Sequence, residues 1–390
     1  MKKSKKKMVK RKEDVMEKDM EYYVRVSGQT IVKNVKRRKE LTEAIVEEYI
    51  KSDKKDICII ASGSSLNAAM MTESFMSKYM NCNVICISPT DYLDYKKEFV
   101  KDRFIILISQ SGCSTNVIRA AEDLNKDRIS YVTLTGNLEG DLKDYAEKLI
   151  EYGVGNETID YVTLGLTTLN EFLILFSLEV AYRLKKVSEQ AYEELVNQIK
   201  QCGRISSEIF EKSVEFTKKH YEELFKMDKA IIVSDGPNMG TAREAALKFG
   251  ETLKIPTIYY ESEEYVHGPN MQLIPGYAVF FIDTNTKNNR MYEVYEATKL
   301  VTEYTYLVTN KQVDEAERVI KNVNGIISEL TPLFTIVPFQ YISANVTKEK
   351  NNFKCHPYFE RFEEKIHCKT DDYEEVMKKK IEKDKEMEEQ

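Results

Sequence analysis

The feature that most constrains how this chain can fold is a short apolar run that leads directly into a hydroxyl-rich loop and then a helix. The run is Phe104 to Ile108, and the loop after it reads Ser109, Gln110, Ser111, Gly112, Cys113, Ser114 and Thr115. Because the run is continuous and does not alternate with polar residues, it predicts a strand buried on both faces of a parallel sheet. Free backbone N–H groups and hydroxyls at the start of a helix favour an anion such as a phosphate. For one such loop alone, a turn that merely caps the helix is the better interpretation.

The same order of elements occurs elsewhere in the chain. An apolar run from Ile57 to Ala61 precedes a predicted helix over 66–79, and the turn between them reads Ser62, Gly63, Ser64 and Ser65. Further strands are predicted at 84–87, 131–135, 230–233, 257–260, 279–282, 304–308 and 333–337, and further helices at 30–51, 117–124, 161–185, 189–225, 241–253 and 290–302. Alternating strands and helices predict an α/β fold with parallel, doubly wound sheets, and two halves of similar order suggest an internal duplication. Such sheets bind ligands beyond the carboxyl ends of their strands, so both hydroxyl loops are expected at that edge.

Composition along the chain divides it into five parts. We expect a charged, flexible lead over residues 1–27, a first domain over 28–188, a helical connector over 189–225 and a second domain over 226–370. Residues 371–390 are nearly all charged, so a solvated helix or a disordered tail is expected there.

Bulk composition argues against several classes of protein. With 42% hydrophobic and 31% charged residues, the chain of 390 residues has the composition of an ordinary soluble protein with two or more domains. No apolar run approaches the roughly 18 residues that span a bilayer, and the basic start lacks the apolar region of a secretory signal. We therefore expect a cytoplasmic protein without a membrane partner. The net charge of −6 argues against nucleic acid as the main partner. The seven cysteines include no CxxC pair, which suggests a reducing compartment and no metal site.

A second group of charged residues lies in the other half of the chain. Glu244, Lys248 and Glu251 are spaced i, i+4 and i+7, which places them on one face of a helix. Such a face is usually an exposed ladder of weak ion pairs, but this helix is otherwise apolar, which predicts that it is mostly buried. His267 comes sixteen residues after Glu251, in a turn with Gly268 and Pro269. Carboxylate and imidazole are the usual pair for proton transfer near neutral pH, although a single loop histidine is more often just solvated.

Together these motifs resemble the double SIS (sugar isomerase) domain family. The resemblance covers about Ile45 to Lys369 and rests on three motifs: the Gly-Ser-Ser turn 63–65, the loop 109–115, and the helix ending at Glu251 with its following His-Gly-Pro turn. The family includes the isomerase half of glucosamine-6-phosphate synthase and the deglycases of phosphorylated fructosamine and glucosamine. It implies two SIS-type, doubly wound, flavodoxin-like parallel sheets. The stretches 251–269 and 357–369 look closer to the glucoselysine-6-phosphate deglycases than to the synthase.

The resemblance implies a role for each matching residue. The residues that would hold the sugar phosphate are Ser64, Ser65, Ser109, Gln110, Ser111 and Ser114. Glu251 would carry a proton between C1 and C2 of the open-chain sugar amine, and Lys248 would lie near the sugar hydroxyls. His267 would assist ring opening from a second subunit, which implies a homodimer with its sites at the subunit interface.

The chain also departs from the family pattern. Cys113 stands where the family often has Glu or Lys, and Leu164 stands where the family has a Lys. The synthase carries a catalytic Lys close to its C-terminus, whereas here a long tail follows Lys369. Lys369 and His367 therefore both remain candidates for the group that opens the ring. No basic residue lies between Ile105 and Ile118, so the predicted phosphate cradle is neutral.

The chemistry is coherent without the family. A phosphorylated sugar amine needs its phosphate anchored, its ring opened and one carbon-bound proton moved, and a single carboxylate of raised pKa can move that proton. The reaction needs no metal and no nucleotide cofactor. We therefore expect a phosphosugar-amine deglycase of the glucoselysine-6-phosphate type, in which water hydrolyses a Schiff base and releases the amine and a hexose 6-phosphate.

Two alternatives stay open. The chain could be an aldose–ketose phosphosugar isomerase like the isomerase part of the synthase; we expect no glutamine-driven synthesis, because no glutamine-hydrolysing domain fits before Ile45. It could instead be a phosphosugar-sensing binding protein. SIS regulators usually carry a helix-turn-helix domain, for which residues 1–27 are too short, and a sensor need not keep Glu251 and His267.

Overall fold

The structure is a computed structural model that describes residues 18–388 except 156, 160, 314–316, 322–324 and 354–355. Most of the expected charged lead, residues 1–17, therefore lies outside the described residues, as do the last two residues of the charged tail.

Two five-stranded parallel sheets organise the described residues. The first has the order β2-β1-β3-β4-β5 and consists of β1 (Ile57–Ile60), β2 (Val84–Ile87), β3 (Phe104–Ser109), β4 (Tyr131–Thr135) and β5 (Leu149–Glu151). The second has the order β10-β9-β8-β6-β7 and consists of β6 (Ala230–Ser234), β7 (Thr257–Glu261), β8 (Ala278–Asp283), β9 (Thr305–Thr309) and β10 (Val319–Lys321). Counted within each sheet, both orders are 2-1-3-4-5, the order of doubly wound flavodoxin-like sheets. The predicted α/β fold with an internal duplication is confirmed.

The central strand β3 is buried along its whole length, as its continuous apolar run predicted. It pairs in parallel with β1 on one side and β4 on the other, with Ile60 opposite Leu107. Strands β5 and β10, which were not predicted, are three-residue edge strands. Their shortness explains why no apolar run marks them in the sequence.

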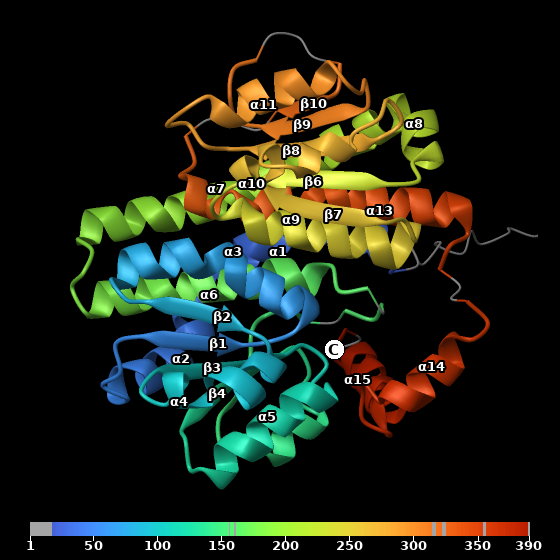
Figure 1. The fold of residues 1–390 in the computed structure, drawn as a ribbon. Coiled ribbons are helices and arrows are strands. Elements are labelled where there is room, and N and C mark those ends of the chain that lie inside the picture. The colour runs from blue at the N-terminus through green and yellow to red at the C-terminus, as the bar shows by residue number, and fades with distance from the viewer. Residues whose placement is uncertain are drawn as a thin grey trace, which may run out of the picture.

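Helices cover both faces of each sheet. They are α1 (Met20–Lys36), α2 (Arg38–Lys51), α3 (Gly63–Met80), α4 (Lys97–Val100), α5 (Thr115–Lys126), α6 (Leu164–Arg183), α7 (Glu189–Lys219), α8 (Tyr221–Lys226), α9 (Asn238–Lys248), α10 (Ser262–Val266), α11 (Arg290–Lys299), α12 (Pro332–Thr335), α13 (Val337–Lys350), α14 (Phe359–Ile366) and α15 (Tyr373–Glu388). Figure 1 shows the two sheets stacked, with α3, α6, α9 and α13 between them. Helix α3 packs on both α6 and α9, so the start of α3, where a serine turn was predicted, faces the second domain.

The apolar run 333–337 is helical, and the prediction of a strand there is wrong. It forms α12 and the start of α13, and every residue of the run is buried. A short apolar run buried on all sides has no periodicity that separates a strand from a helix.

Helix α1 begins at Met20, inside the lead that was expected to be flexible. Met20, Tyr23 and Val24 are buried, and α1 packs along α7 and α13. The charged residues around these three hid an amphipathic helix, because only one of its faces is apolar.

Among the described helices, α6 alone is long and apolar enough to cross a membrane. It was not predicted from the sequence, in which no apolar run of this length was found. Its most apolar 18-residue window is 100% buried inside the protein, as in the core helix of a soluble domain. Length and composition alone are therefore weak evidence for a membrane span here.

Candidate functional site

The two serine loops meet at the edge of the first sheet. Strands β1 and β3 are neighbours, and the strand order reverses between them, which is where ligands bind in doubly wound sheets. The first turn of α5, which follows the second loop, is also joined to the first loop, because Asn116 Nδ2 donates to Ser62 Oγ at 2.8 Å. The expectation that both loops lie at one sheet edge is confirmed.

Local geometry shapes the second loop into a cradle. Ser109 Oγ donates to Ser114 Oγ at 3.2 Å, and the backbone N–H of Cys113 donates to Ser111 Oγ at 3.2 Å. Gly112 has φ +70° and packs against Gly140, where an added Cβ would meet backbone atoms of Ser111 and Gly112 at 2.6 Å. Only glycine fits at both positions, so the loop after β4 holds the cradle in place.

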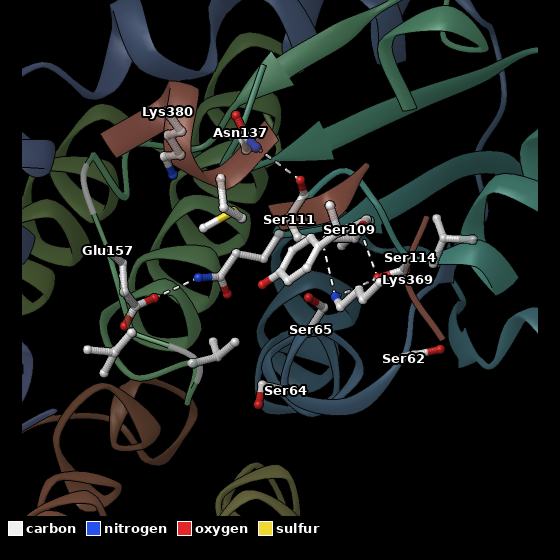
Figure 2. Close-up of a pocket in the computed structure, with 17 residues that line it drawn as sticks. Ser62, Ser64, Ser65, Ser109, Ser111, Ser114, Asn137, Glu157, Lys369 and Lys380 are labelled. Carbon is white, nitrogen blue, oxygen red and sulfur yellow. Dashed lines mark hydrogen bonds between the residues drawn. The ribbon is translucent and has the colours of Figure 1, made fainter. Parts of the chain in front are cut away.

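One pocket collects the six residues predicted to bind phosphate, and we call it the serine pocket. It is lined by Ser62, Ser64, Ser65, Ile108, Ser109, Gln110, Ser111, Ser114, Val117, Asn137, Glu157, Ile159, Val162, Lys369, Tyr373, Met377 and Lys380. In Figure 2 the labelled serines and Lys369 gather on one side of this pocket, with Glu157 and Lys380 on the other. Hydroxyls, backbone N–H groups and the N-terminus of α5 together suit an anion.

The cradle is not neutral, because Lys369 reaches it from the far end of the chain. Lys369 Nζ lies 3.0 Å from Ser111 Oγ and 3.3 Å from Ser114 Oγ. The backbone around Lys369 pairs with the loop, with Thr370 N–H donating to the carbonyl of Cys113 at 3.0 Å. Burial lowers the pKa of the Lys369 ammonium below its ordinary value.

The other ring-opening candidate, His367, is placed differently. Its backbone carbonyl accepts a hydrogen bond from Thr115 Oγ1 at 2.7 Å, but its side chain is exposed and does not line the pocket. Of the two candidates, only Lys369 directs its side chain into the serine pocket.

The charged tail forms helix α15, which packs beside the first sheet (Figure 1) rather than extending as a solvated element. Tyr373, Met377 and Lys380 share one helical face and line the serine pocket, and Val376 beside them is buried. Lys380 Nζ donates to the carbonyl of Gly136 at 2.6 Å. Of the two expectations for this tail, a solvated helix or a disordered segment, the helix is correct, but it is not fully solvated. A few apolar and long side chains at helical spacing hold one of its faces against the pocket.

Glu157 fixes the position of Gln110. Its carboxylate is buried and accepts backbone N–H bonds from Thr163, Leu164 and Gly165 at the start of α6, at 2.6–3.0 Å. It also accepts from Gln110 Nε2 at 2.6 Å. Burial raises the pKa of the Glu157 carboxyl, although these four hydrogen bonds oppose the rise.

The second predicted group is a buried ion-pair cluster and not an exposed ladder. Lys248 is 1% exposed, and its Nζ lies 3.4 Å from Glu244 and 2.7 Å from Glu251. Glu244 is fully buried and accepts hydrogen bonds from Ser64 Oγ at 2.9 Å and Asn67 Nδ2 at 2.8 Å. Burial by itself would lower the pKa of the Lys248 ammonium, but Glu244 and Glu251 together raise it above its ordinary value. Lys248 therefore stays charged between the two domains.

Glu251 lies where the helix changes its winding. Helix α9 ends at Lys248 and continues as a π-helical turn over Phe249–Leu253, a distortion that often marks functional sites. The Glu251 side chain is 36% exposed and opens into a surface hollow. We call this the outer hollow; it is lined by Gly63, Asn67, Arg243, Ala246, Leu247, Gly250, Glu251, Thr257 and Tyr259.

Lys248 joins the two cavities. Its Nζ lies 3.4 Å from Ser64 Oγ, and Ser64 lines the serine pocket. On its other side it holds Glu251, which lines the outer hollow. The first turn of α3 borders both cavities, because Ser64 lines the serine pocket and Gly63 lines the outer hollow.

His267 is not brought to either cavity within one chain. It caps the C-terminus of the short helix α10 and its side chain is exposed. Its predicted role from a second subunit stays a prediction.

Several pocket residues were missed by sequence reasoning. Two of them have a weak signal in the sequence. Asn67 is a polar residue one turn into a buried helix, and Glu157 belongs to a Gly-x-Glu turn. The tail residues Tyr373, Met377 and Lys380 carried none, because their neighbours along the chain are charged. Among the described residues, no group of three or more His, Cys, Asp or Glu side chains is arranged to hold a metal ion.

Comparison with known proteins finds several relatives that carry the same enzyme name. No protein-family model matches the chain. It is 26% identical over 320 residues to the isomerizing glutamine–fructose-6-phosphate aminotransferase of Wigglesworthia glossinidia brevipalpis, covering 78% of this chain and 50% of that protein. It is 21% identical over 328 residues to the enzyme of the same name from Caldanaerobacter subterraneus, covering 83% and 52%. The chain thus spans about half the length of these relatives.

Solved structures share the fold. A candidate phosphosugar isomerase from Clostridium difficile superposes with a TM-score of 0.81 at 19% identity, covering 88% of this chain and 97% of that one. The C-terminal domain of the glucosamine–fructose-6-phosphate aminotransferase from Francisella tularensis gives 0.72 at 19% identity, covering 85% and 96%. The tagatose-6-phosphate ketose/aldose isomerase of Escherichia coli gives 0.66 at 14% identity, covering 87% and 96%. With the duplicated sheets, these similarities show that the chain has the fold of the SIS (sugar isomerase) domain family and resembles the isomerase part of glutamine–fructose-6-phosphate aminotransferase.

Proposed function

We propose that this protein is a phosphosugar-amine deglycase that releases an amine and a hexose 6-phosphate from a substrate of the glucoselysine-6-phosphate type. The proposal rests on one observation: Lys248 is hydrogen-bonded to Ser64 on one side and to Glu251 on the other. It links a cradle suited to phosphate with a carboxylate suited to proton transfer. A single hexose phosphate could occupy both ends of this arrangement.

In the proposed complex the phosphate lies in the serine pocket. The hydroxyls and N–H groups of the cradle would replace its hydration, and Lys369 would meet its negative charge. Burial lowers the pKa of the Lys369 ammonium, which eases the loss of its proton, and of the two ring-opening candidates only Lys369 lines the pocket. Lys369 is therefore our choice for the proton transfers that open the sugar ring.

Glu251 would then carry out the central step. For an open-chain 2-amino aldose, its carboxylate removes the proton from C2 and returns it to C1. The aldehyde oxygen gains a proton and the nitrogen loses one, which leaves a hydroxyl at C1 and an imine at C2. The charged Lys248 at 2.7 Å holds the carboxylate in position. Water adds to the imine carbon, the C–N bond breaks with a proton moving to nitrogen, and the amine leaves with the ketose 6-phosphate remaining. This sequence uses no oxidant and no cofactor.

We further propose that two copies of the chain form a homodimer in which His267 of one copy completes the site of the other. The exposed position of His267, away from both cavities of its own chain, supports this arrangement. The cytoplasmic location stays a prediction from composition.

The alternative is an aldose–ketose phosphosugar isomerase, which the names of several relatives favour. The outer hollow supports the deglycase instead, because it leaves space for a substituent on the nitrogen next to Glu251. An added Cβ at Gly63 or Gly250, which both line it, would meet nothing within 4 Å. A simple isomerase substrate carries no such substituent.

A turnover assay followed by mass spectrometry tests the proposal. Glucoselysine-6-phosphate, fructoselysine-6-phosphate and glucosamine-6-phosphate are each incubated with the wild type, with Glu251→Gln, and with Glu208→Gln as a control at an exposed glutamate on α7. We expect free lysine from the wild type and the control, and none from Glu251→Gln. Conversion of glucosamine-6-phosphate alone would move the protein to the isomerases or deaminases. Tight binding of all three without turnover would make it a phosphosugar sensor.

A further inference from the structure

We propose that Arg243, in the outer hollow, binds a carboxylate on the leaving amine, so that the substrates are phosphosugar derivatives of amino acids and not of ammonia. This inference rests on the proposed deglycase function and names its substrate class. It concerns the end of the site opposite the phosphate, beyond Glu251.

The Arg243 side chain is held in a defined orientation. Its Nε donates to Asn67 Oδ1 at 3.2 Å, and its guanidinium lies 5.3 Å from the ring centroid of Tyr259. Asn67 is itself oriented, because its Nδ2 donates to the buried Glu244 at 2.8 Å. The network that positions the proton carrier through Lys248 therefore also positions the guanidinium.

The charge and shape of Arg243 suit a carboxylate. Among the described residues, no carboxylate forms an ion pair with it, and its contacts are with a neutral amide and an aromatic ring. These contacts leave its two terminal NH₂ groups, the planar fork that grips a carboxylate with two parallel hydrogen bonds. A half-buried guanidinium beside an open cavity is a site for an anion, and the phosphate is already placed in the other cavity.

The position of the outer hollow matches the path of the leaving group. A phosphate in the serine pocket and reacting carbons at Glu251 direct the nitrogen substituent into the hollow. Its walls include Ala246, the half-buried Leu247 and the ring of Tyr259, which suit the methylene chain between an amine and its carboxylate. Ammonia would fill none of this space and would leave the guanidinium without an anion.

Two substrates that differ only in the carboxylate test this assignment. They are glucosamine 6-phosphates whose nitrogen carries either a 5-carboxypentyl or a hexyl group. We expect the wild type to prefer the carboxypentyl compound in kcat/KM by roughly 10- to 100-fold, the range of a charge-assisted hydrogen-bond pair. Because the carboxylate is bound before and during the reaction alike, most of the difference is expected in KM.

Variants of Arg243 test whether this residue causes the preference for the carboxypentyl compound. Arg243→Met should reduce the ratio of the two kcat/KM values to near one, and Arg243→Lys, which keeps the charge but loses the fork, should give an intermediate ratio. Arg204→Met, at an exposed position on α7, is the matched control and should keep the wild-type ratio. If Arg243→Met does not fold, the comparison of the kcat/KM ratio between the wild type and Arg243→Lys still tests the assignment.

Calorimetric binding of both compounds to Glu251→Gln separates this inference from the proposed function. Turnover of both compounds without preference would overturn the role of Arg243 and leave the deglycase standing. A binding preference for the carboxylate without turnover by the wild type would overturn the deglycase and support the carboxylate site. A preference that persists in Arg243→Met would overturn the assignment of Arg243.

Discussion

The buried ion pair between Lys248 and Glu244 offers the sharpest test of the site. We consider Lys248→Met, Glu244→Gln and the double variant. Methionine matches the length of the lysine stem and fits an apolar setting, so the substitution removes the charge while filling most of its space. Glutamine at 244 keeps an acceptor for Asn67 and gains a donor for Ser64 Oγ.

The expected magnitude follows from the geometry. At 3.4 Å, the attraction between Lys248 and Glu244 is about 5 kcal/mol for an effective dielectric constant of about 20. The cost of desolvating both groups offsets much of this in the wild type. The Lys248–Glu251 contact adds less, because Glu251 is 36% exposed and water screens it. In Lys248→Met the buried Glu244 keeps two neutral donors but loses its counter-charge, so the free energy of unfolding should fall by about 3–5 kcal/mol.

The double variant decides whether this reasoning is right. With both charges gone, the free energy of unfolding should fall by less than about 2 kcal/mol relative to the wild type. The coupling energy between residues 244 and 248 is then at least about 1 kcal/mol. Since the chain has no Trp, guanidinium unfolding is followed by far-UV circular dichroism. Glu208→Gln, at an exposed site on α7, serves as the control. Strictly additive losses in the two single variants would refute the buried pair.

Three further predictions concern other buried or docked groups. Burial raises the pKa of Glu171, fully buried in α6, well above its usual value; the contribution of this group to the free energy of unfolding should therefore fall as pH rises above about 4.5, by up to about 1.4 kcal/mol per unit. Glu171→Gln should abolish this fall and raise the Tm at pH 7, and an unchanged pH profile would contradict it. Lys369→Arg keeps a positive charge in the cradle but cannot deprotonate, so inorganic phosphate binding measured by calorimetry should persist while turnover falls at least about 100-fold; turnover near wild type would remove Lys369 from ring opening. A chain ending at Asp372 keeps Lys369 but loses the α15 wall of the serine pocket, and steady-state kinetics should show a severalfold higher KM, whereas an unchanged KM would show that α15 does not contact the substrate.

The sequence by itself determined the sheets and their binding edge. Buried parallel strands need continuous apolar runs, and those at 57–60 and 104–108 were therefore visible without any partner. Since every parallel strand of a sheet ends at the same edge, the serine loops after them could be placed together before their contacts were known. The six phosphate-binding candidates indeed line one pocket.

Only the tertiary structure decided what surrounds those loops. Burial of Lys248 depends on how α3 and α9 pack, and a helical face of Glu, Lys and Glu looks the same in sequence whether it is solvated or enclosed. Lys369 enters the cradle from more than 250 positions away along the chain, and α15 docks through a few side chains within a charged tail. Strand formation is set by neighbours in sequence, whereas the charge and enclosure of a site are set by residues that only folding brings near.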